Sequence, residues 1–129
     1  MKILKKTIAL FLVVALFAAL SMNAFAVTDS DSGVMYNRKW NASYTISGGG
    51  RASGSLSWYG SGTVAIQTST HQKITNTGAV QRTIIRNGIA SGSVSVSATP
   101  DAGCYFNEGS MLAFVRNNYV SSLDVTYKK

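Results

Sequence analysis

The chain is poor in the side chains on which most enzyme and metal chemistry depends. Its 129 residues include one cysteine, one histidine, one proline and five acidic residues. Because Cys104 stands alone, no disulfide can form within the chain, and stability must come from packing. Free cysteine is among the residues most often buried, so we expect Cys104 to be buried and inert, with pairing between two copies as the alternative.

The scarcity of titratable groups argues against catalysis. His71 could combine with a serine and with Asp101 or Asp124 as a catalytic triad, but a serine-rich sequence contains such combinations by chance. The sequence also has no G-x-S-x-G turn that leads into a helix. A glycosidase needs two placed carboxylates, and Asp101 and Glu108 both fall in turn-forming sequence. We therefore expect no enzyme, and interpret His71 as a polar strand or turn residue.

Cofactor, metal and nucleic-acid sites are also disfavoured. His71 and Cys104 have no partners at zinc-ligand spacing, and Asp29 and Asp31 lack the remaining ligands of a calcium loop. The glycines before Arg51 lack the lysine and helix start of a phosphate-binding loop. Basic residues are spread singly along the chain, which disfavours nucleic acid. We expect no cofactor and no metal.

The N-terminal segment has the order of a secretory signal peptide. Three lysines precede an apolar run over residues 8–20, and Ala24 and Ala26 supply the small residues that a signal peptidase recognises. The run is shorter than the roughly 20 residues that span a bilayer. We expect cleavage after Ala26 and a secreted chain of 103 residues with a net charge of +4. No cysteine follows the cleavage site, which excludes a lipoprotein, and the absence of disulfides suits a bacterium.

The sequence after the signal peptide predicts β-strands. Residues 27–35 are polar and turn-rich, and we expect a flexible leader there, followed by one domain over 36–129. Apolar and polar residues alternate with period two over 39–46 and 51–58, the pattern of a hairpin with one buried face. Strands are expected at 63–70, 81–86, 89–98, 104–106, 111–115 and 123–127, with turns at 99–103, 107–110 and 117–118. Asn87-Gly88 predicts a two-residue hairpin turn between the second and third of these strands.

Short strands at this spacing predict an all-β fold. We expect a small antiparallel β-sandwich, or a flattened barrel, of six to seven short strands after a signal-peptide helix.

Aromatic residues gather in the first predicted hairpin, at Trp40, Tyr44, Trp58 and Tyr59. If the first three share the inward face they are core, since aromatic rings bury large areas. If they face outward, they form a strip on which sugar rings could stack. Tyr59 breaks the alternation beside Trp58, so at least one of that pair should be exposed.

Two arginines share a strand face with an apolar residue. Arg82 and Arg86 alternate in phase with Ile84, which is unusual for a core strand. Either the strand lies at a sheet edge, where inward-pointing charge blocks further pairing, or the two form a small basic patch with Arg116. We count these three arginines and the four aromatic residues as candidate ligand-binding residues.

These features predict a secreted, non-enzymatic binding protein. Its expected ligand is a glycan or an anionic cell-wall polymer. One alternative is a bacteriocin-like or pore-forming toxin, the only reading that involves membrane contact. The other is an extracellular matrix protein that self-assembles through its strand edges.

Overall fold

The computed structural model describes residues 26–47 and 50–127, which form eight β-strands. Its strands are β1 (Ala26–Met35), β2 (Arg38–Ser47), β3 (Ala52–Trp58), β4 (Thr63–Ile74), β5 (Val80–Ser91), β6 (Ser93–Ala98), β7 (Cys104–Val115) and β8 (Asn118–Thr126). The predicted all-β sandwich is confirmed, with eight strands in place of the six or seven expected. The expected signal peptide lies outside the described residues, apart from Ala26.

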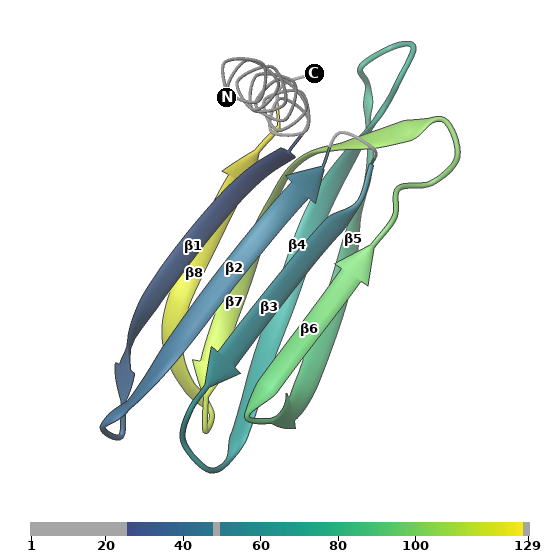
Figure 1. The fold of residues 1–129 in the computed structure, drawn as a ribbon. Helices are drawn as coiled ribbons and strands as arrows, with labels where there is room; N and C mark the ends of the chain where they lie inside the picture. Colours follow the sequence, from purple (N-terminus) through teal and green to yellow (C-terminus); the bar gives the residue numbers. More distant parts are fainter. Residues whose placement is uncertain (1–25, 48–49, 128–129) are drawn as a thin grey trace, which may run out of the picture.

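Two antiparallel four-stranded sheets pack face to face (Figure 1). The first sheet has the order β1-β2-β3-β6 and the second β5-β4-β7-β8. The chain therefore crosses between sheets after β3, β5 and β6. None of the described residues belongs to a helix long and apolar enough to cross a bilayer.

Alternation along the strands builds the core. On β2 the buried positions are every second residue from Trp40 to Ile46, and β3 repeats the pattern from Ala52 to Trp58. The second sheet contributes Val64 and Ile66 from β4, together with apolar residues of β7 and β8. Period-two side chains of both sheets thus meet in one apolar layer.

The polar segment expected to be a flexible leader is instead the edge strand β1, paired with β2 along its whole length. Two features explain why this polar segment forms a strand. Gly33 has no side chain where the Trp40 ring packs; a Cβ there would lie 2.7 Å from that ring. Asp31 and Asp29 point towards the second sheet, where their carboxylates accept hydrogen bonds from Ser121 Oγ (2.7 Å) and Asp124 N (3.1 Å).

The predicted hairpin at Asn87-Gly88 is wrong. β5 passes straight through both residues, neither of which has a positive φ, and the chain turns at Gly92 (φ 75°). β5 and β6 belong to different sheets and are not a hairpin pair. Gly88 serves packing instead, because a Cβ there would lie 2.7 Å from Val94 and 2.8 Å from Val96.

The turn expected at 107–110 is also wrong, since β7 continues from Cys104 to Val115. Gly109 lies where Tyr44 of the facing sheet packs, and a Cβ there would collide with the phenol oxygen. The glycine therefore marks a close approach of the two sheets rather than a bend.

Two tight turns lie between paired strands, one at Tyr36-Asn37 and one at Arg116-Asn117. All four residues have positive φ, between 47° and 65°. This is the geometry of the two-residue type I′ turn, whose twist matches that of the flanking strands. The turn predicted at 117–118 is thus confirmed one residue earlier, while the first turn was missed.

Candidate functional site

The outward side chains of the first sheet form a regular polar grid that we call the serine face. Each of four strands contributes three residues, and the pairing aligns them in three rows. The rows are Thr28–Thr45–Ser53–Ser97, Ser30–Ser43–Ser55–Ser95 and Ser32–Asn41–Ser57–Ser93. Eleven hydroxyls and one amide therefore occupy one side of the sandwich, with no charged residue among the twelve positions.

Strand geometry sets the spacing of this grid. Neighbouring strands lie about 4.8 Å apart, and alternate residues along a strand lie about 6.7 Å apart. Neighbouring hydroxyls within a row form hydrogen bonds, as between Thr28 and Thr45 (2.8 Å) and between Ser43 and Ser55 (3.3 Å). A hydroxyl has one donor and two acceptor sites, so such a bond orients each group and leaves capacity for a ligand.

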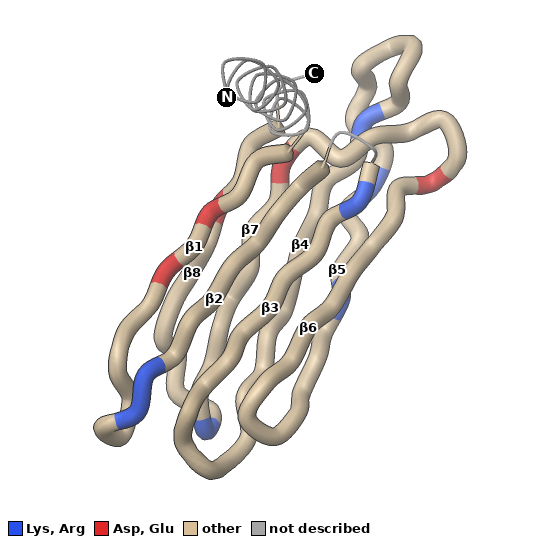
Figure 2. The backbone as a smooth tube through the Cα atoms, in the orientation of Figure 1, with Lys and Arg blue, Asp and Glu red and all other residues tan. Residues whose placement is uncertain are grey.

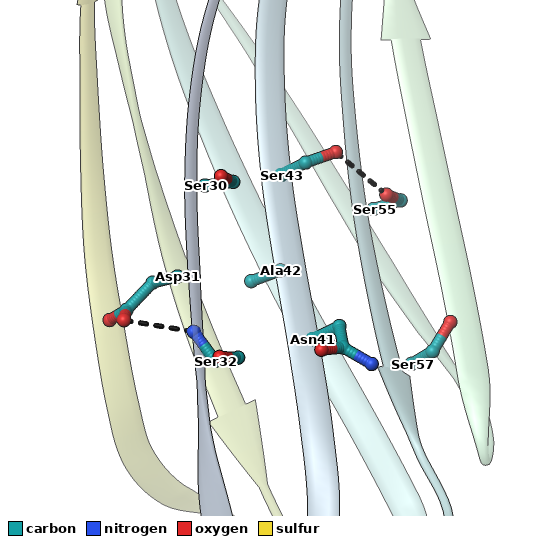
Figure 3. Close-up of a pocket in the computed structure, with 8 residues that line it drawn as sticks. All are labelled: Ser30, Asp31, Ser32, Asn41, Ala42, Ser43, Ser55 and Ser57. Atoms are coloured by element: carbon teal, nitrogen blue, oxygen red, sulfur yellow. Dashed lines mark hydrogen bonds between the residues drawn. The ribbon is translucent and has the colours of Figure 1, made fainter.

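The serine face is hollowed at its centre. A depression of about 500 Å³ lies over β1, β2 and β3, and its walls include Ser30, Asn41, Ser43 and Ser55 (Figure 3). The middle stretches of β2, β3 and β6 carry no basic or acidic residue (Figure 2). The part of the depression over β2 and β3 is therefore neutral and rich in hydrogen-bonding groups, while Asp31 of β1 also lines it and its carboxylate accepts a hydrogen bond from Ser121 of the second sheet.

An exposed aromatic ring continues the grid at one end. Tyr59 follows β3, and its N–H donates to the Lys39 carbonyl (3.0 Å), which extends the β2–β3 pairing by one residue. Strand alternation places Tyr59 on the same side as Ser57. Its side chain is 69% exposed, whereas that of Trp58 is 4% exposed, as expected for a break in alternation between these two residues.

Trp40, Tyr44 and Trp58 are core residues, so the outward aromatic strip is wrong for these three. The sequence already indicated this burial, because Trp40 and Tyr44 fall on the same face of the strand as Ile46. The polar groups of Tyr44 and Trp58 are satisfied inside the protein. The Tyr44 hydroxyl bonds Thr70 Oγ1 (2.5 Å), and the Trp58 indole N–H donates to the Met35 carbonyl (3.1 Å).

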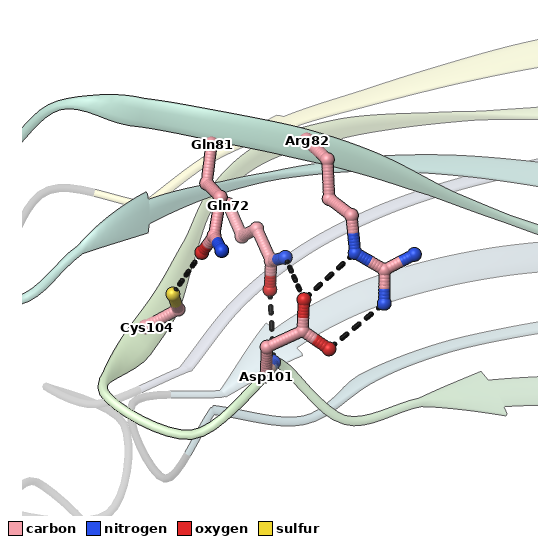
Figure 4. A network of polar contacts seen from close by, with 5 residues as sticks. All are labelled: Gln72, Gln81, Arg82, Asp101 and Cys104. Atoms are coloured by element: carbon pink, nitrogen blue, oxygen red, sulfur yellow. Dashed lines mark hydrogen bonds and ion pairs between the residues drawn. The ribbon is translucent and has the colours of Figure 1, made fainter.

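Arg82 forms an ion pair that fixes the loop between β6 and β7. Its Nε donates to Asp101 Oδ2 (2.7 Å) and its terminal nitrogen to Oδ1 (2.8 Å). The buried Gln72 amide donates to the same carboxylate (2.6 Å) and accepts from the Asp101 N–H (2.9 Å) (Figure 4). Hydrogen bonds from Arg82 and Gln72 lower the pKa of Asp101 from 3.8 to about 2.

Arg116 and Arg86 have other partners. The Arg116 guanidinium lies 4.9 Å from the Tyr36 ring centre and 5.2 Å from that of Trp58, and it donates to the Ser61 carbonyl. Arg86 donates to the Ile85 carbonyl (3.1 Å) on β5, an edge strand of the second sheet. The three arginines thus serve separate contacts, and the edge-strand interpretation of Arg82 and Arg86 is the one that holds.

The remaining reactive side chains lie in two places: Cys104 is at the start of β7, and His71 lines a hollow of about 160 Å³ with Glu108, Ser110 and Asp124. His71 is a strand residue of β4, as expected, and its Nδ1 bonds Thr83 Oγ1 (2.6 Å). Cys104 is half-buried rather than fully buried, and its thiol donates to Gln81 Oε1 (2.5 Å). Within 26–47 and 50–127 no three His, Cys, Asp or Glu residues gather closely enough to hold a metal ion.

No family model and no curated protein matches this chain. The serine face itself was missed at the sequence level. Serine alternation at 53–57 and 93–97 was a visible signal, but the grid needs the order and register of four strands, two of them over 30 residues apart in the chain.

Proposed function

We propose that this protein is a secreted, non-enzymatic binding protein that holds an extended, uncharged glycan on the serine face. The observation that carries the proposal is a neutral hydroxyl grid that ends on the exposed ring of Tyr59. Sugar hydroxyls donate and accept hydrogen bonds, as the serine hydroxyls do. The ring of Tyr59 offers an apolar platform with a polar tip for the C–H face of a sugar.

The same surface favours a neutral glycan over an anionic wall polymer. A polyanion is recognised by clustered Lys and Arg side chains. The basic groups near the serine face, Lys39 and Arg51, stand at its opposite ends, with the uncharged rows between them. Arg82 already neutralises Asp101.

Sedimentation with insoluble cellulose, chitin and β-1,3-glucan tests the proposal. Tyr59→Ala and Ser55→Arg should each weaken retention about tenfold or more, the effect of losing about 1.4 kcal/mol. Thr126→Arg is the matched control, since it adds the same side chain on the outer face of the other sheet and should retain wild-type binding. Equal retention of Ser55→Arg and Thr126→Arg, or no retention of the wild type, contradicts the proposal.

Two further assays address the other classes that the sequence suggested. A membrane-active toxin would release dye from lipid vesicles, and a matrix protein would elute as larger species at higher concentration. A glycan-binding protein should do neither. Vesicle leakage in the absence of glycan retention would replace the proposal with the toxin alternative.

A further inference from the structure

The outer face of the second sheet differs from the serine face. A hollow of about 380 Å³ lies over β4, β5 and β7, lined by Gln67, Asn87, Ile89 and Phe114 among others. Gln67 and Phe114 alternate with buried residues of β4 and β7, so the hollow lies on the outer face of the second sheet. The serine face belongs to the other sheet and lies on the opposite side of the sandwich.

One wall of this hollow is apolar and is formed by Ile89, Ala65 and Phe114, and Tyr119 continues the same row beyond the hollow. The strand pairing aligns Ile89, Ala65, Phe114 and Tyr119 in a single row across all four strands. The Phe114 and Tyr119 rings lie edge to face, with centres 6.1 Å apart and planes at 70°. Ile89 is 73% exposed and Tyr119 is 58% exposed, so the row is open to a ligand.

The next row supplies two amides. Gln67 and Asn87 are paired neighbours on β4 and β5, and their side chains have no hydrogen-bond partner among the described residues. Each amide can donate two hydrogen bonds and accept at its oxygen. No charged residue lines the hollow.

This combination restricts the chemistry of a ligand. A wholly apolar partner would leave both amides desolvated without hydrogen bonds, which is unfavourable. A charged ligand would meet no opposite charge. An uncharged ring with one apolar face and several hydroxyls satisfies both walls, and a pyranose sugar has this form.

We propose that the hollow is a second sugar-binding site. Linked sugar rings lie along the row with their C–H faces on Ile89, Phe114 and Tyr119, and the ring in the hollow exchanges hydrogen bonds with Gln67 and Asn87. The inference rests on the proposed function, because the two sites on opposite faces then let one protein bridge two glycan chains. Such bivalence raises overall retention on a dense glycan without any new contact.

NMR titration of the full chain with soluble cello-, chito- and β-1,3-gluco-oligosaccharides distinguishes the two sites. We expect the side-chain amide signals of Gln67 and Asn87 to shift, together with backbone signals of the serine face. Tyr119→Ala should weaken binding at the hollow about tenfold or more and leave the serine face unchanged, while Tyr59→Ala should do the reverse. Both tyrosines are exposed, so each variant controls for the other.

The outcomes separate the two proposals. Shifts confined to the serine face overturn the second site and leave the proposed function standing. Shifts confined to Gln67 and Asn87 support the hollow and overturn the serine face as the glycan site. Sugar-independent, concentration-dependent shifts around Tyr119 would show that a second copy of the chain occupies the hollow, which also overturns the inference, and no shifts at either site overturn both proposals.

Particle clumping provides a second measurement. Wild-type protein should aggregate cellulose, chitin or glucan particles that retain it, and Tyr119→Ala should bind them without aggregation. Aggregation that persists unchanged in Tyr119→Ala contradicts bridging through the hollow.

Discussion

At the residue scale, Tyr44 joins the two sheets through a polar contact inside the core. Its ring belongs to β2, its hydroxyl bonds Thr70 on β4, and both side chains are fully buried. Burial raises the pKa of Tyr44 and outweighs the opposing effect of the hydrogen bond to Thr70. The pair gives the facing sheets a specific relative position that apolar packing alone would leave less defined.

Tyr44→Phe should lower the free energy of unfolding by about 1–3 kcal/mol, because Thr70 would keep a buried hydroxyl without its partner. Urea denaturation measures the loss. Tyr59→Phe, which removes the same atom from an exposed ring, should change stability by less than about 0.5 kcal/mol. Equal effects of the two substitutions would show that the buried bond contributes nothing specific.

Asp101 makes stability depend on pH in the acid range. Its pKa is lowered from 3.8 to about 2 in the folded protein, so the unfolded chain binds the proton first as the pH falls. The stabilising contribution is therefore complete above pH about 4 and is lost as the pH falls through about 2.

Asp101→Asn should remove this part of the acid dependence. Thermal unfolding between pH 2 and pH 6 should show a shallower acid slope for the variant than for the wild type. Parallel slopes would mean that the ion pair with Arg82 does not contribute to acid stability.

At the scale of elements, β1 closes one open side of the sandwich. β1 and β8 are the edges of their sheets and lie against one another (Figure 1). Asp31 accepts from the buried Ser121, and Asp29 accepts from a backbone N–H of β8. Inward-pointing carboxylates at a sheet edge also discourage pairing with another chain.

Asp31→Ala should destabilise the protein by about 1–2 kcal/mol, because Ser121 loses a charged hydrogen-bond partner. Amide hydrogen exchange should speed up along β1 more than along β3. Asp124→Ala removes the same charge from a side chain that has no hydrogen-bond partner among the described residues, and serves as the control. Uniform exchange rates in Asp31→Ala would contradict a local closing role.

Gly88 is a strand position where packing of the opposite sheet leaves no room for a side chain. Gly88→Ala places a methyl group against Val94 and Val96 of β6, and overpacking of this kind costs about 1–3 kcal/mol. Denaturant unfolding measures this, with Asn87→Ala as the neighbouring outward control. A neutral Gly88→Ala would mean that β6 can move away at no cost.

At the scale of the whole molecule, the two outer faces give the sandwich two different surfaces, one a hydroxyl grid and one partly aromatic. If the chain is exported as its first residues predict, both faces are presented outside the cell. Mass spectrometry of the medium of a bacterial culture expressing the gene should then find a 103-residue chain that begins at Val27.

Substitutions at the predicted cleavage site test whether the signal peptide is removed. Ala24→Arg with Ala26→Arg should block cleavage, because a signal peptidase accepts small residues at these positions. Asn23→Ala should be processed normally. Recovery of the chain with residues 1–26 still attached in the wild type would contradict the predicted signal peptide.

Much of this fold could be predicted from local pattern. Trp40 and Tyr44 alternate with Ile46, so their burial follows from the two-residue period of a strand. The same period predicts the outward position of Tyr59, and Asn117 indicates the last turn. Strand existence and the choice of buried face are local properties, set by residues within a few positions of one another.

Sequence alone determined that the chain folds as two-faced strands with few ionisable groups. Only the tertiary structure decided which strands are neighbours. Residues 26–35 form a strand despite their polar sequence, because Asp29 and Asp31 have hydrogen-bond partners 95 and 90 residues away, respectively. Asn87 and Gly88 lie within β5 instead of in a turn, and β6 packs against Gly88. The serine face and the opposite hollow have the same origin, since each combines side chains whose proximity depends on long-range register rather than local alternation.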